Sequence, residues 1–67
     1  MNIPLKVAMV KKRQSQRAVA AAAHINEDRL SAIVHQWVTP RDDERLAIAE
    51  VLGVKVEELF PVDPIKG

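Results

Sequence analysis

The spacing of the aliphatic residues constrains this chain more than any other feature. Val, Ala, Leu and Ile recur three and four residues apart rather than two, which is the period of helices and not of strands. The chain has 67 residues and no cysteine, so it forms one small domain without disulfides or thiolate metal sites. The pattern predicts an all-α fold, a compact bundle of five helices of which the last is short.

Start signals divide the first half of the chain into three helices. Pro4 suits the first turn of a helix, because the N–H that proline lacks is unpaired there. This helix is expected to end in the basic stretch KKRQ. Ser15 and Asn26 are good N-caps for the next two helices. The expected second and third helices span 16–23 and 27–35.

The second half of the chain carries a different set of signals. Thr39 and Pro40 are expected to form the N-cap and first residue of a fourth helix. Gly53 supplies a left-handed ending for that helix, and a short fifth helix is expected over 56–60. The domain boundaries expected from these signals are 1–60 for the folded domain and 61–67 for a disordered tail.

The chain lacks the residue groups that most enzymes and metalloproteins need. The only glycines are Gly53 and Gly67, so no glycine-rich phosphate loop is present. His24 and His35 are isolated from each other and from ligand-spaced carboxylates. We therefore expect no enzyme activity, metal, cofactor or small-molecule ligand.

The N-terminal segment does not resemble a targeting or membrane segment. Residues 1–10 contain no long apolar run, so neither a signal peptide nor a membrane span is expected there. Without cysteine or an export signal, the expected compartment is the cytoplasm.

Charge is distributed unevenly along the chain, although the formal net charge is only +1. Residues 1–26 carry five Lys and Arg and no Asp or Glu, whereas residues 27–67 carry nine acidic and five basic residues. The basic first third is suited to meet phosphates. The alternative is an ordinary solvated helix face, and charge alone favours that alternative.

The stretch SQRAVAAAAHINEDRLSAIVHQ has the pattern of two helices that cross steeply over a short turn. Ala20 is expected at the closest approach, where a larger side chain would push the helices apart. Five further apolar residues fall where such a pair must be held together. These are Val19, Ala23, Ile25, Leu30 and Ile33.

Several segments resemble the Cro and lambda-repressor type, or Xre-like, helix-turn-helix family. SQRAVA resembles the opening of its second helix, and INEDRLSAI its turn and recognition helix. The fourth helix and closing segment of the family have their counterparts in Pro40 with LAIAEVLGV and in VEELF. The resemblance covers Leu5 to Phe60. The family usually has glycine where this chain has His24 and often where it has Gln36. His24 is therefore expected in a left-handed conformation, which histidine tolerates better than β-branched residues.

The resemblance implies which residues meet DNA bases. Glu27, Asp28 and Ala32 match positions that usually touch base edges, and Ser31 lies on the flank. A carboxylate can accept a hydrogen bond from cytosine N4. Equally, Glu27 and Asp28 can stabilise the positive end of the helix. We favour this second role for Asp28 and leave both roles open for Glu27.

Phosphate contacts are expected around the start of the second helix, where backbone N–H groups point outward. Gln16, by the resemblance, and Arg17 belong there. The further phosphate candidates are Lys12, Arg13, Arg29, His35 and Thr39. Trp37 is a candidate too, but its spacing from Ile33 and its size favour a place in the core.

Two functions are weighed. The first is a sequence-specific duplex-DNA-binding transcription regulator, a bacterial or phage repressor or Cro-like protein, acting as a dimer. Its dimer surface is expected in the C-terminal segment, with Val54, Phe60 and Val62, and also Ile65; Leu59 is expected in the core instead. The alternative is a protein-interaction module on the same fold, an antitoxin or adaptor, which the acidic residues after residue 27 favour.

Overall fold

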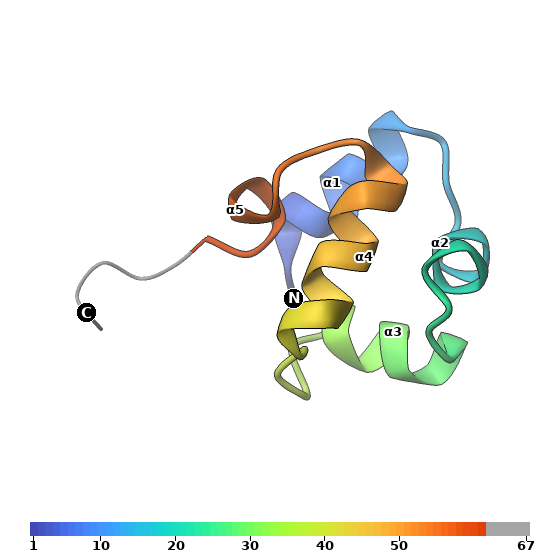
Figure 1. Ribbon diagram of the computed structural model, residues 1–67, viewed down its shortest axis with the longest axis vertical. Helices are drawn as coiled ribbons and strands as arrows, with labels where there is room; N and C mark the ends of the chain where they lie inside the picture. The colour runs from blue at the N-terminus through green and yellow to red at the C-terminus, as the bar shows by residue number, and fades with distance from the viewer. Residues whose placement is uncertain (62–67) are drawn as a thin grey trace.

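The computed structural model describes residues 1–61, which fold into α-helices and loops without strands in that range. The helices are α1 (Ile3–Lys11), α2 (Gln16–Ala23), α3 (Glu27–Val34), α4 (Asp42–Leu52) and α5 (Val56–Leu59) (Figure 1). The expected all-α bundle with a short last helix is confirmed. None of these helices has the length and apolar character required to span a bilayer.

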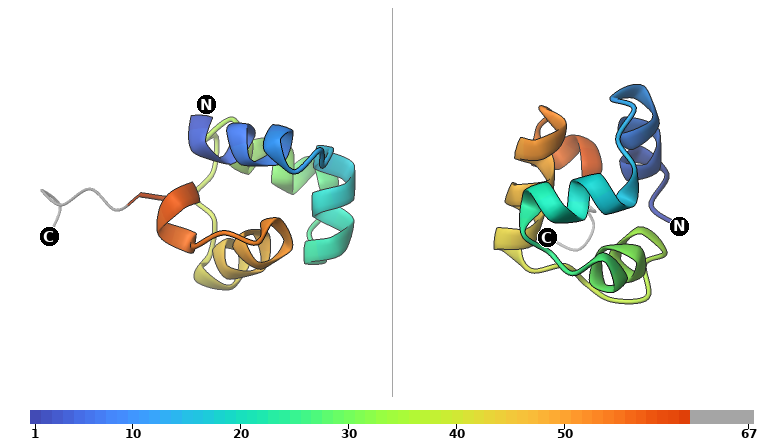
Figure 2. Two further views of the ribbon diagram at one scale, coloured as in Figure 1. Left: turned by 90° about the horizontal axis from the view of Figure 1, so that it is seen from above. Right: turned by 90° about the vertical axis from the view of Figure 1, so that its right-hand side faces the viewer.

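The five helices enclose one apolar core. Seen from above, α1 and α4 lie on opposite sides of it, with α2 at one end and α5 at the other (Figure 2). Each large aliphatic side chain buried there contributes about 1.5–3 kcal/mol to folding. The most completely buried side chains are Leu5, Val19, Leu30, Ile33, Val34, Ile48, Leu52 and Leu59. Leu59 therefore belongs to the core, as expected.

Asn2 joins the ends of three helices and is buried. Its side-chain oxygen accepts a hydrogen bond from the N–H of Leu5 at 3.0 Å and so caps α1. Its side-chain nitrogen donates to the carbonyl of Leu59 at 2.9 Å, and its backbone N–H donates to the carbonyl of Val34 at 2.7 Å. Because Asn2 is the cap, α1 begins at Ile3, one residue before Pro4.

A left-handed residue stands at the C-cap of α2 and α4 and directly after the C-cap of α1 and α3. The φ values are 55° at Arg13, 59° at His24, 63° at Gln36 and 69° at Gly53. At each end, two successive N–H groups donate to carbonyls of the last turn, such as the N–H of Ile25 to the carbonyl of Ala20 at 2.8 Å. The expected conformation of His24 is thus confirmed, and Gln36 adopts it too, although only Gly53 lacks a β-carbon.

The expected start of the fourth helix is wrong by two residues. Neither Thr39 nor Pro40 begins it: α4 starts at Asp42, and Arg41 is the N-cap. The reason is that Glu44, in the third position of α4, reaches back and accepts a hydrogen bond from the backbone N–H of Arg41 at 2.8 Å. The expected third and fifth helices each end one residue earlier than predicted. The expected tail lies, apart from Pro61, outside the described residues.

Candidate nucleic-acid interface

α2 and α3 pack directly on each other and are joined by a short turn at His24 (Figure 2). Ala20 is 2% exposed, so no room remains at this position for a larger side chain. The apolar residues expected to hold the pair together are buried, except Ile25, which is half-buried against the core. This arrangement leaves the outer face of α3 and the start of α2 open to a partner.

The start of α2 combines backbone donors with positive charge. The Ser15 hydroxyl accepts a hydrogen bond from the N–H of Ala18 at 3.0 Å, and so it caps the helix. Gln16 is half-buried and Arg17 is exposed at the first two positions of the helix. Lys12 and Arg13 are exposed just before it. Backbone N–H groups and the Arg17 side chain make this end of α2 suited to anions, whereas Lys12 Nζ lies beside Gly53 at the end of α4.

The start of α3 has the opposite charge. Asn26 caps the helix, since its side-chain oxygen accepts from the N–H of Asp28 at 2.8 Å. Glu27 and Asp28 are exposed, and no ion pair within residues 1–61 engages either carboxylate. Ser31 and Ala32 are half-buried one turn later. The four base-reading candidates therefore follow the accessible side of α3, with two carboxylates at its start.

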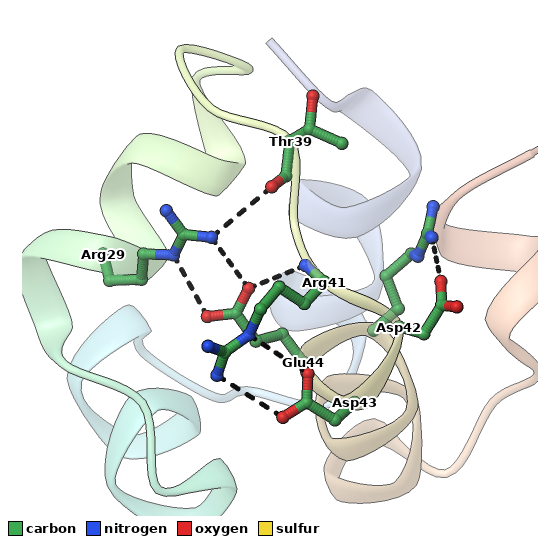
Figure 3. A network of polar contacts seen from close by, with 7 residues as sticks. Arg29, Thr39, Arg41, Asp42, Asp43 and Glu44 are labelled. Carbon is green, nitrogen blue, oxygen red and sulfur yellow. Dashed lines mark hydrogen bonds and ion pairs between the residues drawn. The ribbon is translucent and has the colours of Figure 1, made fainter.

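Arg29 makes a two-point ion pair between α3 and α4 (Figure 3). Its Nε donates to Glu44 Oε2 at 3.0 Å, and its Nη2 donates to Glu44 Oε1 at 2.9 Å. Nη2 also approaches the carbonyl of Thr39 at 3.4 Å. Such a parallel pair fixes direction as well as distance. The guanidinium therefore ties α3 to the start of α4.

Glu44 is the site residue that the sequence patterns did not identify. Its side chain is 8% exposed and holds both Arg29 and the backbone N–H of Arg41. These two donors lower the pKa of Glu44 from 4.5 to about 2, with Arg29 the larger cause. The available signal was its place three residues after Arg41, which is the spacing of a carboxylate that caps a helix start.

The segment after α3 presents two stacked aromatic rings. The rings of His35 and Trp37 lie 4.6 Å apart at an angle of 20°. His35 Nδ1 donates to the carbonyl of Ser31 at 2.8 Å, because a carbonyl oxygen can only accept. Thr39 is exposed beyond them. His35 and Trp37 thus form a stacked pair of rings directly after α3.

The predicted core position of Trp37 is wrong, since its residue is 73% exposed. The prediction assumed that the helical spacing from Ile33 continues to residue 37. α3 ends at Val34, however, and the left-handed Gln36 turns the chain. Val38, the next residue, packs against the core instead.

The matched family agrees with this geometry. Residues 4–64 match the family of the Cro/C1-type HTH DNA-binding domain. Comparison with individual curated proteins finds no match. The family match covers most of the chain, and its name describes the α2–α3 pair seen in the structure. The chain therefore belongs to the Cro/C1-type helix-turn-helix DNA-binding domain family.

Proposed function

We propose that this protein is a small bacterial or phage transcription regulator, a repressor or Cro-like protein of the cytoplasm, that binds duplex DNA sequence-specifically with α3 in the major groove. The observation that carries the proposal is the packing of α2 on α3 with Ala20 buried in the core, which leaves the outer side of α3 accessible. Helix-turn-helix proteins place a helix held in this way against base edges.

In this proposal the start of α2 binds the phosphate backbone. Gln16 and Arg17 lie beside the backbone N–H groups of the first turn, and Lys12 and Arg13 add charge. His35 and Thr39, in the segment after α3, are secondary phosphate contacts. Arg29 is engaged by Glu44, so we assign it to holding α3 in place rather than to phosphate.

The start of α3 supplies the sequence preference. Glu27 and Asp28 are exposed and accept hydrogen bonds only, which suits cytosine N4 and opposes phosphate. Ala32 is small enough to let the helix sit deep or to contact a thymine methyl group. Asp28 lies beside the helix cap, so its main role in this proposal is to stabilise the helix start.

A second copy of the chain is the proposed protein partner. One domain of this size covers too little DNA for tight specific binding, so two copies on neighbouring half-sites are expected. Val54 and Phe60 of the C-terminal segment are half-buried, which leaves part of each side chain available. Val62 and Ile65 of the same expected surface lie outside the described residues.

The test is a titration of the ¹⁵N-labelled protein with a mixed-sequence duplex. Shifts are expected at residues 12–17 and along α3, and added salt should weaken them, because phosphate binding releases counterions. Trp37 is the only tryptophan and is exposed beside α3, so its fluorescence gives an independent reading. Absence of any duplex binding at low salt would favour the protein-interaction module, for which the exposed Glu57 and Glu58 are the supporting observation.

A further inference from the structure

α1 carries an apolar stripe on its outer side, opposite the residues that it buries. Ile3 is 58%, Val7 43% and Val10 69% exposed. At 100° per residue these three side chains lie within about 60° of one another around the helix. The α1 stripe therefore remains in water in a single copy of the chain, although it has the spacing of a helix–helix contact.

Lysines border the α1 stripe on both sides. Lys6 and Lys11 are exposed and occupy the positions that flank such a seam in paired helices. α1 contains no acidic residue. Two α1 helices placed seam to seam would set lysine against lysine, so the charges oppose pairing of a stripe with a second stripe.

A second apolar surface lies between α4 and α5. Leu46, Val56 and Phe60 line a hollow of about 410 Å³, the α4–α5 hollow, and Leu46 is 61% exposed. The charged residues that line it are Asp42, Arg45 and Glu57. Glu50 adds a further exposed carboxylate one turn after Leu46.

The α4–α5 hollow is therefore acidic where the α1 stripe is basic. Arg45 already pairs with Asp42, which leaves Glu50 and Glu57 as the carboxylates of this surface that make no ion pair within residues 1–61. Two hollows placed face to face would repel each other, whereas a stripe and a hollow attract. α1 and α4 lie on opposite sides of the core, so the α1 stripe and the part of the hollow that α4 provides belong to different sides of one molecule (Figure 2).

We propose that copies of this chain associate head to tail, with the α1 stripe of one copy in the α4–α5 hollow of the next. The inference rests on the proposed function, in which a second copy meets the C-terminal segment, and it identifies the surface which that copy presents. Because the two faces differ, each added copy leaves one stripe and one hollow free, and the contact can repeat. Three side chains on each side make a weak contact, which becomes effective when DNA holds two copies side by side.

Two variants that each remove one face test the proposal. Val7→Gln/Val10→Gln removes the stripe and Leu46→Gln removes the hollow, without adding charge. The substituted side chains are exposed, so both variants are expected to melt at the wild-type temperature. Self-association of each variant alone, measured by concentration-dependent ¹⁵N shifts of the full chain, should weaken at least about tenfold.

An equal mixture of the two variants should associate again, because one intact stripe then meets one intact hollow. With Leu46→Gln labelled, shifts should appear on α1, and with the other variant labelled they should appear on α4 and α5. The variant with all three substitutions should not associate with either. The mixture should form a 1:1 complex, whereas the wild type continues to larger species.

Other outcomes overturn the inference. Undiminished association of Val7→Gln/Val10→Gln alone means that two hollows meet, and undiminished association of Leu46→Gln alone means that two stripes meet. A wild-type protein that stays monomeric at millimolar concentration has neither contact.

Both variants should bind a single-site duplex as the wild type does and lose only the steeper binding to two adjacent sites. Restored association in the mixture without any duplex binding would refute the proposed function and leave this inference standing.

Discussion

At the residue scale, three side chains with β-carbons adopt a backbone conformation that favours glycine. Arg13, His24 and Gln36 have φ values of 55°, 59° and 63° and, like Gly53, donate their N–H groups to the last turn of the preceding helix. A left-handed residue with a β-carbon costs about 1–2 kcal/mol. These positions are therefore places where the chain gives up stability that glycine would supply.

His24→Gly should raise the free energy of unfolding by about 0.5–1 kcal/mol, because the relief of strain exceeds the extra chain entropy of glycine. The melting temperature should rise by a few degrees. Gly53→Ala is the matched reverse change and should destabilise by about 1 kcal/mol. An added Cβ at Gly53 meets nothing closer than Lys12 Nζ at 3.9 Å, so backbone strain alone is measured. Equal melting temperatures for His24→Gly and wild type would contradict the argument.

Glu27→Gln separates the two roles left open for this carboxylate. If Glu27 reads cytosine, the variant should bind random duplex more tightly and lose about 1–3 kcal/mol of discrimination at one base pair. If Glu27 only stabilises the start of α3, affinity should rise equally on all sequences and the melting temperature should fall slightly. Selection of binding sites from a random pool, with wild type and variant in parallel, gives the answer. The same preferred sequence for both proteins removes the base-reading role.

At the element scale, the α2–α3 crossing depends on a small side chain. Ala20, expected at the crossing, is 2% exposed, whereas Ala21 on the same helix is exposed. Ala20→Leu should destabilise by about 1–3 kcal/mol or more, because the added atoms overpack the crossing. Ala21→Leu adds the same atoms in water and should change stability by less than about 0.5 kcal/mol. Thermal melting compares the two, and equal values would place the crossing elsewhere.

The ion pair between α3 and α4 should give the protein an acid-dependent stability. The pKa of Glu44 lies at about 2 in the folded chain, below its ordinary 4.5, so the folded state binds fewer protons than the unfolded state between these values. The stabilisation is complete above pH 4.5 and is lost as the pH falls towards 2.

Glu44→Gln measures this contribution. The variant should lose about 1–3 kcal/mol at pH 7, because Arg29 and the N–H of Arg41 lose their charged acceptor. The difference in unfolding free energy from wild type should shrink steadily from pH 4.5 downward. Asp43→Gln is a control, because Asp43 pairs with Arg41 on the surface and is exposed. A difference that stays constant with pH would argue against the role of Glu44.

At the scale of the whole molecule, the first third of the chain carries only basic charge, and Arg17 of this set is exposed in the first turn of α2. Arg17→Ala should weaken binding on all duplexes alike and reduce the slope of log affinity against log salt by about 0.9 per subunit. Lys55→Ala removes one charge at the start of α5, away from α2 and α3, and should leave the slope unchanged. Equal slopes for all three proteins would remove Arg17 from the interface.

The sequence by itself determined the helices and the crossing. Aliphatic spacing, the caps Ser15 and Asn26 and the small Ala20 are local signals, and each gave the element that the structure contains. The left-handed His24 was also predicted, by the resemblance, because the family usually has glycine at this position. The resemblance of the chain to its family added the expectation that α3 is the recognition helix.

Only the tertiary structure decided the features that depend on partners distant in sequence. Trp37 lies in water because the left-handed Gln36 turns the chain, a change that helical spacing does not carry. α4 begins at Asp42, two residues after the expected Pro40, because Glu44 accepts from the N–H of Arg41, and Arg29, 15 positions before Glu44, holds the same carboxylate. Asn2 reaches the carbonyl of Leu59, 57 positions away, only when the chain is closed. Local periodicity encodes which face of a helix is apolar, whereas side chains that cross between helices are set by the packing that brings those helices together.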